Sequence, residues 1–227
     1  NGYFKILQNM IDSKDIIHSR YAYFQSVSLP DNAAAVTTGK HLTQIIKAVC
    51  AEKGYGKWKD QILPPKSDFE KAQNLCRSFL IEFFGKIDAY KHALKSEPSE
   101  IPELRDKENS KKWGLLFKPM PQVALAEAIL FLKEESDMDV NAIYREINRI
   151  DWSWKSGSQF EGMVITSDGT ILTGGKIQKR LTSMIIYWVL GRAKFLKLLG
   201  EKELQQLDKD YKKTTNNKSE FPSVVRK

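Results

Sequence analysis

The segment from residue 151 to residue 180 constrains the fold of this chain most, because it combines a turn signal with a helix start. Apolar and polar residues alternate from 160 to 165, and a Ser-Asp-Gly sequence at 167–169 precedes the return of apolar residues. Two glycines at 174–175 then separate this pattern from a long amphipathic sequence. The segment therefore predicts a β-hairpin at about 160–173 followed by a helix.

Apolar residues recur at helical spacing through most of the remaining chain. This periodicity predicts helices at 2–12, 40–52, 68–94, 121–134 and 139–149, and a C-terminal helix from about 177 to 213 with a candidate break at Gly191. Phe79 and Phe83 lie on the broadest apolar stripe, so we expect them to be buried, together with Trp152 and Trp188. The predicted fold class is mainly α with one β-hairpin (α+β).

The length of 227 residues is enough to bury a core without disulfides. We expect a single mainly helical domain over residues 1–200 and a basic C-terminal extension over 201–227. Residues 95–112 are polar and contain two prolines, which predicts an exposed connection. Because the chain begins without Met in the middle of an apolar pattern, we interpret it as a fragment or a processed chain.

The two cysteines, Cys50 and Cys76, lie in helix-like apolar patterns, which is typical of buried thiols in a reducing cytosol. We therefore expect a cytoplasmic protein. The sequence contains no Cys-x-x-Cys motif, no cofactor motif and no nucleophile beside an evident base. No apolar run reaches about 18 residues. The expectation is no catalytic residue, no metal, no cofactor and no membrane span.

The net charge of the chain is concentrated at its C-terminal end. Residues 176–227 contain 13 Lys and Arg and 5 Asp and Glu, whereas residues 1–175 contain 23 of each class. The whole formal net charge of +8 therefore lies in the last 52 residues. This asymmetry favours a polyanionic partner, and a solvated basic tail that only aids solubility is the alternative.

The start of the predicted C-terminal helix is the first candidate nucleic-acid site. Lys176, Lys179 and Arg180 follow the two glycines directly. The first amides of a helix have no partner within the helix and attract phosphate oxygens, and basic side chains beside them add charge. Arg192 and Lys194 continue the basic character further along. These five residues predict DNA phosphate contacts; a solvated helix face is the alternative.

A second candidate site lies on the helix predicted at 139–149. Two predicted helices followed by a hairpin resemble part of a winged helix, and Arg145 and Arg149 are spaced to face a groove from the second of them. The alternative is surface charge paired with Glu146 or Asp151.

The aromatic and acidic residues beside the hairpin have both a structural and a functional interpretation. Trp152 and Trp154 could stack on bases, but anchoring of the core is favoured for a Trp beside a hairpin. Asp151 and Glu161 form a carboxylate pair without a third ligand at a recognisable spacing, so they predict no metal site.

Several of these elements together resemble a known family. The DWS sequence at 151–153, the FEG sequence at 160–162, the hairpin, and a helix ending in LG at 190–191 resemble the C-terminal half of DndB-type DNA sulfur modification proteins, the DGQHR-domain family. Residues 1–58 also resemble the middle segment of that family. The Asp-Gly-Gln-His-Arg motif does not occur in this chain, and Phe160 stands where a Trp is more usual.

The resemblance implies a DNA-binding regulatory or accessory protein of a bacterial or archaeal DNA phosphorothioation system, with a part in transcription regulation. DNA is the expected partner, other proteins of the modification system are further candidates, and a homo-oligomer is left open. One alternative is a nuclease-like enzyme whose catalytic part lies outside this chain. Another is a protein–protein interaction module of a DNA modification or defence complex.

Overall fold

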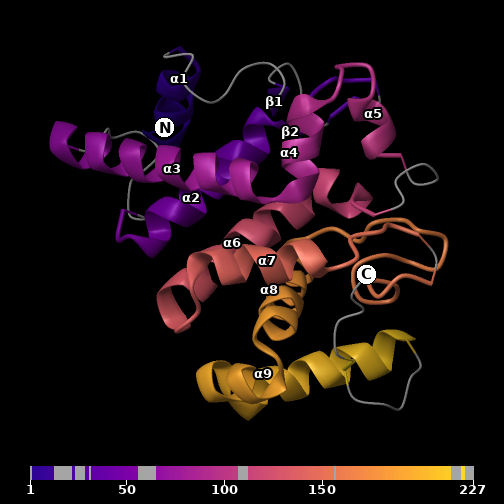
Figure 1. Ribbon diagram of the computed structural model, residues 1–227. Coiled ribbons are helices and arrows are strands. Elements are labelled where there is room, and N and C mark those ends of the chain that lie inside the picture. The colour runs from indigo at the N-terminus through magenta and orange to yellow at the C-terminus, as the bar shows by residue number, and fades with distance from the viewer. Residues whose placement is uncertain are drawn as a thin grey trace. The chain divides into compact units, whose positions relative to one another are not determined.

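The computed structural model describes residues 2–12, 22–23, 29–30, 32–55, 65–106, 112–155, 157–215 and 221–222 (Figure 1). The protein is mainly helical, as predicted. The chain divides into two compact units, residues 1–104 and 105–227. The single domain over residues 1–200 with an extension over 201–227 stays a prediction.

The first unit is built of helices and one short pair of strands. Its elements are α1 (Gly2–Asp12), β1 (Ala22–Tyr23), β2 (Thr37–Thr38), α2 (Gly39–Glu52), α3 (Lys66–Lys86), α4 (Asp88–Lys95) and α5 (Ile101–Leu104). The two strands pair in parallel. Helices α1, α2 and α3 each contact the other two, and α4 packs on α3 (Figure 1).

The single helix predicted over 68–94 is two helices. Helix α3 ends at Lys86, and Ile87 is extended, with φ −85° and ψ 119°, before α4 begins. Gly85 weakens the last turn of α3, because a glycine loses more backbone freedom in a helix than other residues do. The extended backbone places the side chain of Ile87 in the core, where it is fully buried.

An aromatic cluster fills the core of the first unit. Phe83 lies at its centre, with ring centroids 5.8 Å from Phe79, 5.3 Å from Phe84 and 5.3 Å from Tyr90. All four side chains are buried, which confirms the prediction for Phe79 and Phe83. Aromatic pairs at such distances stabilise a core beyond the area they bury.

The two cysteines face each other between α2 and α3. Cys50 and Cys76 are free thiols, both buried, with 3.7 Å between their Sγ atoms. The hydrogen bond with Cys50, together with burial, raises the pKa of the Cys76 thiol. The prediction of buried thiols is confirmed.

The connection predicted over 95–112 is partly folded. Helix α5 lies within it, and the side chain of Ile101 is fully buried. The interpretation of the whole stretch as an exposed connection is therefore wrong at Ile101 and Arg105, which is also buried. Residues 107–111 lie outside the described residues.

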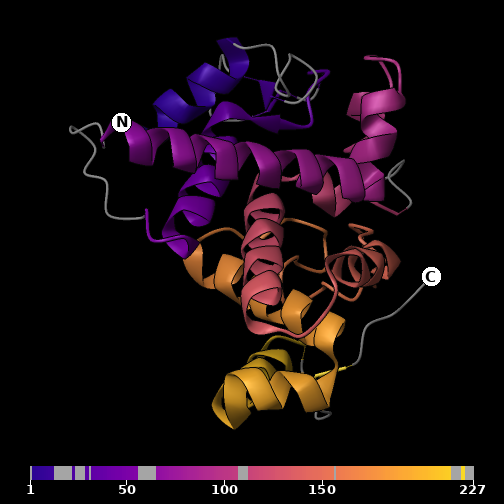
Figure 2. The same cartoon turned by 60° about the vertical axis from the view of Figure 1, so that its left-hand side comes forward.

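Helix α8 is the centre of the second unit. The elements are the 3₁₀ turn η1 (Gly114–Phe117), α6 (Pro119–Glu135), α7 (Val140–Arg149), α8 (Gly175–Leu190) and α9 (Arg192–Thr215), with a kink at Gly200. Helix α8 contacts α6, α7 and α9, and α6 and α9 lie on opposite sides of it (Figure 2). The break predicted at Gly191 separates α8 from α9. No helix in the described ranges combines the length and the apolar character of a membrane span.

The predicted hairpin is present but short. Thr166 N–H donates to Thr170 O at 2.9 Å, Leu172 N–H donates to Val164 O at 2.8 Å, and no longer strand forms among the described residues around it. Residues 162–164 make a turn, and Glu161 and Ile165 form only isolated bridges in place of the expected strand. Gly162 has φ +77°, a left-handed conformation that interrupts an extended strand and that favours glycine.

A second aromatic cluster joins the hairpin segment to α8 and to the C-terminal end. The ring of Phe160 lies 5.6 Å from Trp152 and 5.4 Å from Trp188, and Trp188 stacks on Phe221 at 5.7 Å. All four side chains are buried, which confirms the prediction for Trp152 and Trp188. The indole Nε1 of Trp152 donates to Ile147 O at 3.0 Å, so this tryptophan anchors the core.

Candidate nucleic-acid interface

The sequence motifs that carry the family resemblance form a structural core. Trp152 of the DWS sequence and Phe160 of the FEG sequence are stacked on each other inside the second unit. Trp154 is partly buried; its Nε1 donates to Gly169 O at 2.5 Å, and the Lys118 ammonium lies 3.7 Å from its ring centroid. The hydrogen bond fixes Trp154 against the hairpin turn, so neither tryptophan presents an open ring for base stacking.

The two carboxylates beside the hairpin hold backbone amides. Asp151 accepts a hydrogen bond from Ser153 N–H at 3.1 Å, and Glu161 accepts one from Gly157 N–H at 2.5 Å. Within the described ranges, no group of three or more His, Cys, Asp or Glu side chains is arranged to hold a metal ion. Both carboxylates therefore stabilise the conformation of the loop that carries them.

The start of α8 is exposed to solvent. Gly174 precedes the helix with φ 112°, and no side chain of the described residues caps the first turn. Lys176 and Lys179 are both exposed and extend from this first part of the helix. The first-turn amides and the two ammonium groups together make this end of α8 positively charged.

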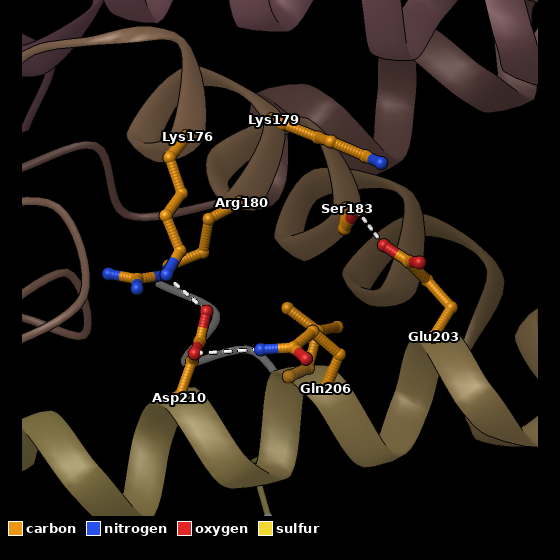
Figure 3. A pocket seen from close by; sticks show the side chains of 8 residues that line it. Lys176, Lys179, Arg180, Ser183, Glu203, Gln206 and Asp210 are labelled. Carbon is orange, nitrogen blue, oxygen red and sulfur yellow. Dashed lines mark hydrogen bonds and ion pairs between the residues drawn. The ribbon is translucent and has the colours of Figure 1, made fainter.

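A cavity lies between this part of α8 and helix α9. Its volume is about 250 Å³, and it is lined by Lys176, Lys179, Arg180, Ser183, Glu203, Gln206, Leu207 and Asp210 (Figure 3). The structure therefore brings together the three residues that the sequence predicts at the helix start. Figure 3 shows the Lys179 side chain extending away from Arg180, which reaches instead toward Asp210 on α9.

Arg180 differs from the two lysines because its guanidinium is used inside the protein. Its Nε donates to Asp210 Oδ2 at 2.9 Å and its Nη1 to Met163 O at 2.9 Å. The Arg180 side chain is 8% exposed and that of Asp210 13%. A paired guanidinium in such an environment holds α8, α9 and the loop at Met163 together. This arrangement gives Arg180 a structural role, and its contact with phosphate stays a prediction.

The acidic residues on α9 that line the cavity are also bound within the unit. Ser183 Oγ donates to Glu203 Oε1 at 2.7 Å, and Gln206 Nε2 donates to Asp210 Oδ1 at 2.9 Å (Figure 3). The floor of the cavity is thus a hydrogen-bonded set of opposite charges, whereas Lys176 and Lys179 lie exposed at its rim. This arrangement suits an anion held at the rim better than one placed deep in the cavity.

The remaining predicted residues lie apart from this cavity. Arg192 and Lys194 are exposed on the first turn of α9, beyond the Gly191 break, and are not among the described residues that line the cavity. Arg145 and Arg149 lie on α7, where both approach Glu146 Oε1, at 3.8 Å and 2.8 Å. The pairing with Glu146 that the alternative expects is present, and a groove contact by Arg145 and Arg149 stays a prediction.

Sequence reasoning missed Asp210, Glu203 and Ser183. Asp210 engages Arg180, and Glu203 and Ser183 bind each other, but each lies 20 residues or more from its partner in the chain. No local spacing reveals such pairs.

Comparison of the chain with protein-family models, with curated proteins and with solved structures finds no match.

Proposed function

We propose that this chain binds duplex DNA through the exposed basic side chains of α8 and α9. In this proposal it acts as a regulatory or accessory protein of a DNA phosphorothioation system. One observation carries the DNA-binding part. In the described part of residues 176–227, every Lys and Arg except Arg180 is exposed. The charge asymmetry of the sequence therefore lies on the surface, where it can attract a polyanion.

The start of α8 is the first contact in this proposal. Lys176 and Lys179 stand near the uncapped first turn, so two ammonium groups and free backbone amides at this end of the helix would contact neighbouring phosphates. Arg192 and Lys194 flank this contact from the start of α9. Contacts of this kind position a protein on DNA without reading its sequence.

The regulatory part of the proposal is supported by the resemblance to the DGQHR-domain family. Trp152 and Phe160, which belong to the motifs that carry the resemblance, pack in one aromatic core with Trp188.

The test is a binding titration with a labelled duplex over a series of salt concentrations. The Lys176→Gln/Lys179→Gln variant should bind all duplexes more weakly, and the slope of log K against log salt should fall by about 0.9 for each lost phosphate contact. Lys66→Gln/Lys71→Gln is the matched control, because it removes the same charge from exposed positions of α3. Arg180 is left unchanged because of its structural role.

Two results would contradict the proposal. Absence of salt-dependent binding by the unmodified chain would exclude DNA binding. Cleavage of the duplex by the chain with Mg²⁺ would favour the nuclease-like alternative. The regulatory part is tested by footprinting on DNA upstream of phosphorothioation genes, where protection should exceed that of an unrelated duplex.

A further inference from the structure

The second half of α9 has no net charge in its sequence. Between residues 201 and 213 it contains four acidic side chains, Glu201, Glu203, Asp208 and Asp210, and four lysines, Lys202, Lys209, Lys212 and Lys213. Sequence alone therefore indicates no charged face on this helix. In the folded helix, most of the acidic side chains have partners within the unit, whereas the lysines are exposed.

Three of the four acidic side chains have partners within the unit. Glu203 accepts a hydrogen bond from Ser183, Asp210 binds Arg180, and Asp208 accepts one from Phe221 N–H at 2.6 Å. The C-terminal segment thus provides a hydrogen-bond partner for Asp208, as α8 does for Glu203 and Asp210. These contacts engage three of the carboxylates within the unit, whereas Glu201 is exposed and Asp208 also borders the open hollow described next.

All four lysines are exposed. At roughly 100° per residue they fall within an arc of about 100° on one side of the helix, and at 1.5 Å per residue they span about 16 Å. An open hollow of about 550 Å³ lies on this side, lined by Gln205, Asp208, Lys209, Lys212 and Lys213. We call Lys202, Lys209, Lys212 and Lys213 the lysine stripe.

We propose that the lysine stripe is a second contact for the phosphate backbone of duplex DNA, separate from the start of α8. This inference rests on the proposed function and extends the surface that carries it. The exposed side chains of residues 201–213 are Glu, Lys and Gln only. Stacking on unpaired bases needs aromatic side chains, and insertion into a bilayer needs large apolar ones. A row of ammonium groups without either suits the outside of a duplex, where phosphates are contacted without base recognition.

The experiment compares the full chain with the Lys209→Gln/Lys212→Gln/Lys213→Gln variant in the same salt titration. Glutamine keeps a good helix propensity, so α9 should be retained, and circular dichroism checks this. The slope of log K against log salt should fall by roughly two to three, and two unrelated duplexes should lose affinity equally. Lys66→Gln/Lys71→Gln/Lys95→Gln is the matched control, because it removes the same charge from exposed positions of the first unit.

The outcomes separate this inference from the proposed function. If the unmodified chain binds DNA and the stripe variant binds with unchanged affinity and slope, the inference is wrong and the proposed function stands. If the control variant loses as much as the stripe variant, the effect is one of net charge and the inference is wrong. If the unmodified chain does not bind DNA at all, both fail. Replacement of the same three lysines by arginine should preserve binding, because the charges remain.

Discussion

Arg180 and Lys179 are neighbours in the sequence, yet the fold gives them opposite environments. Lys179 is exposed, whereas the guanidinium of Arg180 is buried against Asp210 and the carbonyl of Met163. Both residues have the same charge and the same place in the predicted basic helix. Their roles differ because only Arg180 points toward the part of α9 that carries Asp210.

Replacement of Arg180 by alanine should destabilise the second unit. Removing one partner of a buried ion pair leaves the other buried without compensation, so we expect the free energy of unfolding to fall by about 3 kcal/mol. Urea denaturation measures this change. Lys179→Ala is the control and should change stability by less than about 0.5 kcal/mol. Equal stability of the two variants would show that the ion pair does not support the fold.

His41 links the stability of the first unit to pH. Partial burial, with a smaller effect of Lys40, lowers the pKa of His41 from 6.5 to about 4. Between these two pH values the unfolded chain binds a proton that the folded chain does not. The contribution of His41 is therefore fully present above about pH 6.5 and is lost as the pH falls toward 4.

The free energy of unfolding should accordingly decrease between pH 6.5 and pH 4. Denaturation series at several pH values measure this slope, and His41→Gln should make it shallower because the titrating group is removed. If the slope of the variant equals that of the unmodified chain over this interval, His41 is not the responsible group.

At the scale of elements, the turn at Gly162 is fitted closely to the end of α9. A Cβ atom at this position would lie 2.8 Å from Thr215 Cγ2 and 3.0 Å from Thr214 O. The same glycine interrupts the predicted strand, so one residue both shortens the hairpin and permits the helix to approach it.

Gly162→Ala should therefore lower the free energy of unfolding by more than the strain of a left-handed backbone alone would. Gly157→Ala is a matched control, because Gly157 has φ +77° as well but no atom within 4 Å of its Cβ position. We expect Gly157→Ala to cost about 1 kcal/mol for the left-handed backbone and Gly162→Ala about 1–3 kcal/mol more for the overlap. Thermal denaturation of the pair measures the difference. Equal midpoints would show that α9 moves aside without cost.

The spacing of apolar residues predicted most of the helices. It located the helices that became α1, α2, α6, α7, α8 and α9, because α6 is apolar nearly all round and the others have an apolar face. It failed at Ile87, since an apolar residue in extended backbone fits the helical pattern equally well. It overestimated the hairpin because alternation at 160–165 does not reveal the left-handed backbone of Gly162.

For the whole molecule, the sequence identified the end of the chain that carries the net charge but not its arrangement. Lys176 and Lys179 are exposed as predicted for a binding surface, and Arg180 is not. The lysine stripe has no signature in the net charge of residues 201–213, because four acidic side chains balance its four lysines there. The stripe is recognised only in the folded chain, where Ser183, Arg180 and Phe221 bind three acidic side chains of α9. All three partners are distant from α9's carboxylates in the sequence.

The anchored C-terminal segment also determines how the second unit responds to mechanical force. The N–H of Phe221 is held by Asp208, its ring lies on Trp188, and Trp188 Nε1 donates to Pro222 O at 3.2 Å. A pull applied at Pro222 would therefore load α8, through Trp188, and α9, through Asp208, at the same time.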